Sequence, residues 1–146
     1  SVVSDVDLSS SPLMHDSRVI LPSDVVTFGP RGREVKPTED VKKDESILDA
    51  GPNTLAQLAP LISNAHSILW NGPLGDYERG FEDGTKVLAC MIADAEGHSI
   101  VGGGDTVAAI KALKLNEKFD FISTAGGAML QFLENETLPG IEALRS

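Results

Sequence analysis

The chain has 146 residues, of which 41% are hydrophobic, enough for one ordinary buried core. Its net charge of −10 argues against binding to nucleic acids and to anionic membranes, because both need clustered Lys and Arg. No stretch approaches the roughly 20 apolar residues of a membrane span and nothing near Ser1 resembles a signal peptide, so we expect a soluble protein located in the cytoplasm.

The first part of the chain predicts a strand, an exposed connection and a helix. Residues 19–26 (VILPSDVV) are typical of a strand, with a break or a sheet edge at Pro22, since proline cannot donate to a strand ladder. The charged residues 29–46 predict an exposed connection or an edge hairpin. Residues 55–65 (LAQLAPLISNA) predict a helix that kinks or stops early at Pro60, where a backbone donor is missing.

From residue 67 onward, short apolar runs alternate with helical patterns. Strands are predicted at 67–70, 99–101 and 119–123, and helices at 84–97, 105–115 and 128–135. The first of these helices carries Cys90, which we interpret as a buried, inert thiol, and Gly97 is its expected C-cap. Strands that alternate with helices imply parallel β-α-β units. We therefore expect an α/β fold, a three-layer Rossmann-like sandwich with a mostly parallel sheet and a ligand at the carboxyl ends of its strands.

A glycine corner follows the strand at 99–101, in the sequence SIVGGGDTVAAI. Glycines let backbone N–H groups approach a ligand, and the amino end of the following helix adds partial positive charge, so the corner suits a phosphate. Asp105 and Thr106 stand where they could hold Mg²⁺ and a phosphate oxygen. The alternative is that Asp105 is a plain N-cap beside a tight turn.

The sequence FISTAGGAML repeats this strand–glycine–helix design at Gly126 and Gly127. Two corners at neighbouring strand ends could face the same polyphosphate or transferring phosphoryl group. The alternative is that the glycines only let strand and helix pack closely.

The sequence LWNGPLGDYE predicts a rigid loop at the end of the strand at 67–70, where ligand contacts commonly lie. Glu78 could accept hydrogen bonds from two ribose hydroxyls, and Pro73 could lie against a purine ring. The alternative is a turn that carries one solvated acid.

These stretches resemble the phosphoglycerate kinase family. WNGPLGDYE is similar to its motif W-N-G-P-x-G-x-F-E, and IVGGGDTVAA resembles its G-G-G-D-[ST] segment. STAGGAMLQFLENETLPGIEAL is similar to its ending S-T-G-G-G-A-S-x-E-x-L-E-G-x-x-L-P-G, while ILPSDVV and LDAGPNT resemble L-P-x-D-V and L-D-x-G-P. The resemblance runs in order from Val19 to Leu144, and the chain is identified as a member of this family.

The resemblance implies phosphoryl transfer between 1,3-bisphosphoglycerate and ADP, with Mg²⁺, to give 3-phosphoglycerate and ATP. For the nucleotide it implies that Leu48 is the apolar residue under the adenine, that the loop beside the base consists of Asn71, Gly72 and Pro73, and that Glu78 is the acid on the ribose. It implies that the phosphate-binding segment consists of Gly103, Gly104, Asp105 and Thr106. It also implies that Asp105 holds the metal and that the amides nearest the transferring phosphoryl group belong to Gly104, Gly126 and Gly127.

Three residues depart from the family pattern near the implied site. Ala125 replaces the first glycine of S-T-G-G-G, and its Cβ would strain the corner if that position needs a positive φ. Asp76 stands where the family carries an apolar residue, so an added acid would weaken nucleotide binding. Tyr77 replaces a phenylalanine and adds a hydroxyl.

The resemblance covers only part of the family's pattern. Nothing before Val19 resembles the phosphoglycerate-binding domain or the lysine-bearing glycine-rich stretch. We therefore expect residues 1–146 to be a partial C-terminal nucleotide-binding domain, with a sheet incomplete at its N-terminal half. Phosphoglycerate would bind through the missing N-terminal domain. The family is usually monomeric, but this fragment would associate through its open sheet edge.

We expect negligible kinase activity for this chain alone, because groups that stabilise the transition-state charge would be missing. Two other functions remain open. One is a non-catalytic module that binds adenine nucleotides without transfer. The other is a dinucleotide-binding domain of a dehydrogenase, against which the missing G-x-G-x-x-G counts.

Overall fold

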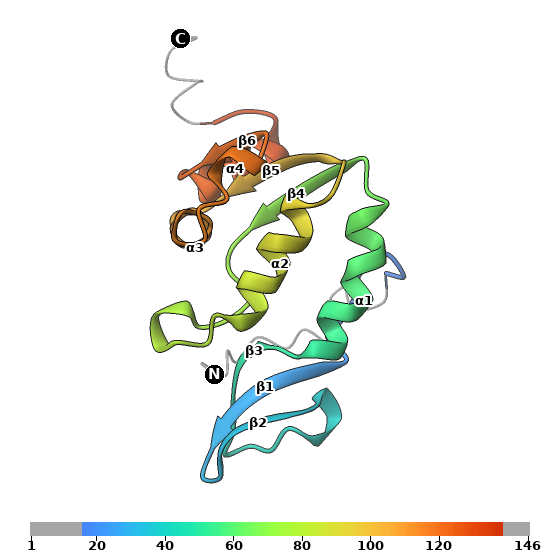
Figure 1. Cartoon of the computed structure of the whole chain (residues 1–146), viewed down its shortest axis with the longest axis vertical. Coiled ribbons are helices and arrows are strands. Elements are labelled where there is room, and N and C mark those ends of the chain that lie inside the picture. Colours follow the sequence, from blue (N-terminus) through green and yellow to red (C-terminus); the bar gives the residue numbers. More distant parts are fainter. Residues whose placement is uncertain (1–15, 139–146) are drawn as a thin grey trace.

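The computed structural model describes residues 16–138, which form two small sheets and four helices (Figure 1). The strands are β1 (Asp24–Gly29), β2 (Gly32–Pro37), β3 (Ser46–Ala50), β4 (Ser67–Asn71), β5 (His98–Gly102) and β6 (Phe121–Ser123). The helices are α1 (Pro52–Ser63), α2 (Asp83–Ala93), α3 (Gly104–Ala112) and α4 (Gly126–Asn135). Short 3-10 turns lie at Thr38–Asp40, Tyr77–Arg79 and Asn116–Lys118.

The first sheet is antiparallel, with strand order β2-β1-β3. Strand β1 is buried along most of its length, whereas the charged strand β2 is alternately half-buried and exposed. Of the two alternatives predicted for residues 29–46, the edge hairpin is correct for 29–37, where β2 pairs with β1, and residues 38–45 form a connection to β3. The strand predicted at 19–26 begins at Asp24, two residues beyond Pro22, as expected for a residue that cannot join a ladder.

The second sheet is parallel, with strand order β4-β5-β6. Helix α2 connects β4 to β5 and helix α3 connects β5 to β6, so the β-α-β units and the α/β class are confirmed. The pattern did not predict that the first three strands would form an antiparallel sheet of their own.

The core lies between the parallel sheet and the helices α1, α2 and α3. Trp70 of β4 and Val101 of β5 are buried there against Ile62, Leu88 and Ile110, one from each of these helices. The opposite face is partly covered by α4.

Successive side chains along a strand point to opposite faces of the sheet, and this alternation shows on which face α4 lies. Gly102 is adjacent to Val101 and therefore points to the other face, where a methyl group added to it would lie 2.3 Å from the Cε of Met129 in α4. The parallel sheet is thus the middle of three layers.

Some local predictions were wrong. The early stop at Pro60 is wrong, because helix α1 continues to Ser63, while a kink at Pro60 stays a prediction. Helix α2 ends at Ala93, and Gly97 does not cap it; Gly97 packs instead against the backbone of Ala65.

Cys90 lies on the outer side of α2 and is exposed, so it is not the buried thiol that its apolar neighbours suggested. Within residues 16–138, no helix is long and apolar enough to cross a membrane.

Candidate functional site

The three parallel strands end side by side. The register pairs Asn71 with Gly102 and Gly102 with Ser123, which are the last residues of β4, β5 and β6. The residues that follow these strands therefore meet at one edge of the sheet, where α/β folds commonly place ligands.

The first glycine corner turns directly from β5 into α3. Gly103 has a φ of +98°, a conformation that side chains other than glycine rarely adopt, and it precedes the first residue of α3. No side chain caps this helix, so its first N–H groups have no partner from a cap. Gly104 and Asp105 are exposed at this end, and a methyl group added to Gly104 would meet no atom within 4 Å.

The second corner lies directly against the first. The N–H of Gly103 donates to the carbonyl oxygen of Ser123 at 3.1 Å. A methyl group added to Gly126 would lie 2.5 Å from the nitrogen of Gly103. Helix α4 also lacks a side-chain cap, and Gly127 in its first turn faces open space. The prediction that the two corners adjoin is confirmed, and two uncapped helix amino ends lie beside each other.

Asn71 lies at the junction of the two corners. A methyl group on Gly126 would be 2.2 Å from its Oδ1, and one on Gly103 would be 3.4 Å from the same atom. Oδ1 is buried and has no hydrogen-bond partner among the described residues. An unpaired buried acceptor is costly, so the close approach of the two corners is made at the expense of this oxygen.

The loop after β4 is held from several sides. Gly72 has a φ of +99°; its carbonyl oxygen accepts from Nε1 of Trp70 at 2.8 Å, and its N–H donates to Oγ1 of Thr106 at 3.0 Å. Further along, the N–H of Asp76 donates to the carbonyl oxygen of Leu48 at 2.8 Å. The loop is thereby tied both to the glycine corner and to β3.

A cavity of about 350 Å³ lies between this loop and α3. It is lined by Pro73, Gly75, Asp76, Tyr77, Glu78, Asp105 and Ala108. The structure therefore brings together three of the residues that the sequence assigned to a nucleotide site: Pro73, Glu78 and Asp105.

The other six assigned residues do not line this cavity. Four of them, Asn71, Gly72, Gly103 and Gly104, belong to the loop and the glycine corner described above. Leu48 is only 6% exposed and its side chain belongs to the core, so its place under an adenine stays a prediction. Thr106 is fully buried, and its hydroxyl accepts the bond from Gly72 described above. Its contact with a phosphate oxygen likewise stays a prediction.

The structure removes the expected strain at Ala125, and the effect of Asp76 on nucleotide binding stays a prediction. Ala125 has a φ of −93°, so the corner does not need a glycine there and its Cβ causes no backbone strain. Asp76 accepts a hydrogen bond from the N–H of Arg79, whose guanidinium lies 3.5 Å from its carboxylate. Part of the added negative charge is thus offset locally.

Sequence reasoning missed two buried residues that support the loop. Oγ1 of Thr85 accepts from the N–H of Leu74 at 3.0 Å. Asp49 is 2% exposed, and its Oδ2 accepts from the N–H of Gly84 at 2.9 Å. Burial raises the pKa of Asp49, although this hydrogen bond opposes the shift. The signal for Asp49 was a lone charge inside the apolar run SILDA.

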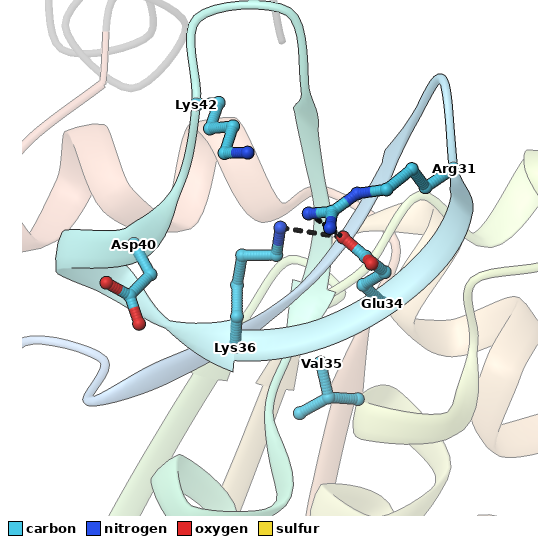
Figure 2. A pocket seen from close by; sticks show the side chains of 6 residues that line it. All are labelled: Arg31, Glu34, Val35, Lys36, Asp40 and Lys42. Atoms are coloured by element: carbon cyan, nitrogen blue, oxygen red, sulfur yellow. Dashed lines mark hydrogen bonds and ion pairs between the residues drawn. The ribbon is translucent and has the colours of Figure 1, made fainter.

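A second cavity, of about 550 Å³, lies on the β1–β2 hairpin and is lined by Arg31, Glu34, Val35, Lys36, Asp40 and Lys42 (Figure 2). Its cations are largely paired: Nζ of Lys36 lies 2.8 Å from Glu34 and 2.6 Å from Glu45, and Arg31 lies 3.1 Å from Glu34. This ion-pair network leaves little free positive charge for an anionic ligand.

The family model for phosphoglycerate kinase matches residues 7–136. The chain is 48% identical over 112 residues to the phosphoglycerate kinase of Francisella philomiragia and 47% identical to that of Francisella tularensis subsp. novicida. Each match covers 76% of this chain and 29% of the relative, so the chain spans less than a third of their length.

Solved structures of the same family are similar in fold. The phosphoglycerate kinase of Coxiella burnetii matches with a TM-score of 0.74 and 44% identity, over 84% of this chain and 33% of that one. The enzyme of Pyrococcus horikoshii matches with a TM-score of 0.72 and 32% identity, over 85% and 32%. Together with the family model, these likenesses show that the chain belongs to the phosphoglycerate kinase family.

Proposed function

We propose that this chain is part of the C-terminal, nucleotide-binding domain of a phosphoglycerate kinase and that its glycine corners bind Mg²⁺-ADP or Mg²⁺-ATP. The observation that carries the proposal is the junction at Asn71, where two uncapped helix amino ends meet beside a cavity lined by Pro73, Glu78 and Asp105. A nucleotide fits this arrangement, because its phosphates suit the backbone amides of the helix ends and its nucleoside suits the cavity.

The phosphate tail would lie across the amino ends of α3 and α4. The backbone N–H groups of Gly104, Gly126 and Gly127, closest to the transferring group, would donate to its oxygens. Such fixed donors stabilise spread negative charge, which is most of what phosphoryl transfer requires of a protein. The N–H of Gly103 is already bonded to Ser123, so Gly103 would contribute by shaping the corner.

The nucleoside would occupy the cavity. Pro73 offers an apolar surface to the base, and the exposed carboxylate of Glu78 can accept from ribose hydroxyls. Gly72 and Asn71 would hold the loop against the corner, through the Gly72–Thr106 hydrogen bond.

The residues present fit a magnesium ion only as part of a nucleotide complex. In the described part of the chain, no group of three or more His, Cys, Asp or Glu side chains could hold a metal. Asp105 would therefore supply one carboxylate, and the phosphates and water would supply the other ligands, as Mg²⁺ prefers. When bound, the ion would neutralise charge on the phosphate oxygens.

The whole enzyme's reaction is part of the same proposal: a phosphoryl group passes between 1,3-bisphosphoglycerate and ADP, in the cytoplasm, with phosphoglycerate bound by a part of the family fold outside this chain. No Lys or Arg is among the residues that line the cavity. The 146-residue chain would therefore act by itself as a nucleotide-binding module without transfer activity.

Calorimetric titration of the chain with Mg²⁺-ADP tests the site. We expect saturable binding that weakens about tenfold without Mg²⁺, a difference that Asp105→Asn removes because it loses a charged acceptor. Binding that is absent, or that is indifferent to both Mg²⁺ and Asp105, would contradict the proposal. A coupled ATP assay that showed ordinary turnover by this chain would contradict the binding-only role.

A further inference from the structure

Asp49 is a buried carboxylate that lies between the loop of residues 72–81 and the amino end of α2. Its Oδ2 accepts from the N–H of Gly84 at 2.9 Å and its Oδ1 from the N–H of Ala50 at 2.8 Å. Gly75 of the loop packs directly on it, because a methyl group there would lie 2.6 Å from the Cγ of Asp49. The loop rests on this carboxylate without a side chain between them.

The hydrogen bonds on either side of Asp49 hold the same loop. Leu48, its neighbour in β3, accepts from the N–H of Asp76 at 2.8 Å. Thr85, the neighbour of Gly84, accepts from the N–H of Leu74 at 3.0 Å and from that of Gly75 at 3.4 Å. The hydrogen bond that Gly84 donates to Asp49 therefore joins the two elements that support the loop, α2 and β3.

The charge on Asp49 is costly where it lies. Burial raises the pKa of Asp49, and the nearby negative charge of Asp83 in α2 raises it further. The N–H groups of Gly84 and Ala50 and the positive charge of Arg33 in β2 act in the opposite direction. A core that only had to fill this space would favour an apolar residue. The carboxylate is retained at a position where its two oxygens meet two backbone donors.

We propose that Asp49 is a positioning residue that sets the place of residues 73–78, the loop wall of the nucleotide cavity. The predicted effect of Asp49 on nucleotide affinity rests on the proposed function. The effect of Asp49 on the position of the loop does not, because it can be measured without a nucleotide. Asp49 does not itself line the cavity but packs against one lining residue, Gly75 of the loop, so it acts through the loop.

The chain provides a matched control in Asp24. This buried carboxylate of β1 accepts from the N–H groups of Asn53 and Thr54, in the first turn of α1. Asp24 and Asp49 thus both anchor the amino end of a helix from the antiparallel sheet, but only Asp49 contacts the loop. A purely structural role would give Asp24→Asn and Asp49→Asn the same effect on the loop.

Amide hydrogen exchange of the full 146-residue chain, followed by residue, tests the proposal. We expect Asp49→Asn to speed exchange at residues 74–78 about tenfold, because one acceptor is lost, while exchange at residues 98–112 stays as in the original chain. Asp24→Asn should speed exchange in the first turn of α1 and leave residues 74–78 unchanged. Equal acceleration of the loop by both substitutions, or none by Asp49→Asn, would overturn the proposal.

Titration with Mg²⁺-ADP then measures the consequence. We expect Asp49→Asn to weaken binding about fivefold to tenfold and Asp24→Asn to leave it within about twofold, both at temperatures where the variants are folded. Unchanged affinity after Asp49→Asn would overturn the positioning role. If the unsubstituted chain binds no nucleotide, the proposed function is contradicted instead. The hydrogen-exchange pattern would still test whether Asp49 positions the loop.

A measurement on the unsubstituted chain covers the case in which Asp49→Asn does not fold. The amide proton shifts of Gly84 and Asp76 should inflect together as Asp49 titrates, with a midpoint above the usual value of about 3.9 for an aspartate. If the amide shift of Gly84 inflects with pH while the shifts of the loop amides do not, the coupling between Asp49 and the loop is overturned.

Discussion

At the scale of single residues, the site depends on how closely three backbones approach one another. Asn71, Gly103 and Gly126 come from the ends of three neighbouring strands, and there is no room for a Cβ at Gly126. Gly127, in the same helix turn, differs from Gly126, because a Cβ added to Gly127 would face open space. Adjacent glycines therefore serve separate purposes, close contact at one and access at the other.

Alanine at each of these two glycines separates the purposes. Gly126→Ala should destabilise the chain by about 1–3 kcal/mol, because the new methyl group would overlap Asn71 and the backbone of Gly103. Gly127→Ala should stabilise it by about 0.4–1 kcal/mol, since alanine favours the helix and its Cβ meets no atom. Urea unfolding measures both. Equal effects of the same sign would contradict the close approach of the two corners.

At the scale of secondary structure, the antiparallel sheet anchors the helices that surround the core. Asp24 of β1 binds the amino end of α1, and Asp49 of β3 binds that of α2. Buried carboxylates are favourable at helix amino ends, where unpaired N–H groups and the helix dipole attract negative charge. The family segments L-P-x-D-V and L-D-x-G-P thus meet physically, since Asp24 also accepts from the hydroxyl of Thr54.

The anchoring of α1 gives a pH-dependent stability. Burial acts to raise the pKa of Asp24, but the N–H groups of Asn53 and Thr54 outweigh it and the pKa lies below its usual value. A depressed pKa means that Asp24 stabilises the fold above the unfolded value of about 3.9, and that this contribution is lost as the pH falls through the lower folded value.

Asp24→Asn should therefore cost about 1–3 kcal/mol at pH 7, where a charged acceptor is lost. The difference from the original chain should shrink as the pH falls below about 3.9, because the protonated acid resembles the amide. Unfolding free energies measured between pH 7 and pH 3 check this. A difference that stays constant over that range would contradict the assigned charge state.

The elements that the sequence predicted well are those governed by local pattern. Alternating apolar runs and helical spacing predicted β4, β5, β6 and the helices between them, and the glycine motifs predicted both corners. Tertiary contacts decided the rest: Gly97 packs on the backbone of Ala65 instead of capping α2, and Asp49 is buried among elements distant in sequence. Thr106 was correctly placed at the corner, but its buried bond to Gly72 depends on a loop 34 residues away.

At the scale of the whole molecule, the parallel sheet has one face that its own helices cover incompletely. Leu69, Ile100 and Phe121 pair side by side across β4, β5 and β6. Leu69 is 47% and Phe121 57% exposed. A contiguous apolar row of this kind commonly marks an interface. Because the chain spans 29% of its relatives, we propose that the row contacts a part of the family fold outside this chain.

Truncation of Phe121 in two contexts tests this interpretation. In the 146-residue chain, Phe121→Ala should change the unfolding free energy by less than about 0.5 kcal/mol, since the ring is already largely solvated. In a chimera where this chain replaces the matching segment of the Francisella philomiragia enzyme, the ring would be buried, and the same change should cost about 3–5 kcal/mol. Leu61→Ala, at an exposed leucine of α1 in the opposite layer, is the control and should have a small effect in both proteins. An equally small cost for Phe121→Ala in the chimera would mean that the rest of the family fold does not cover this face, and the proposed contact would be wrong.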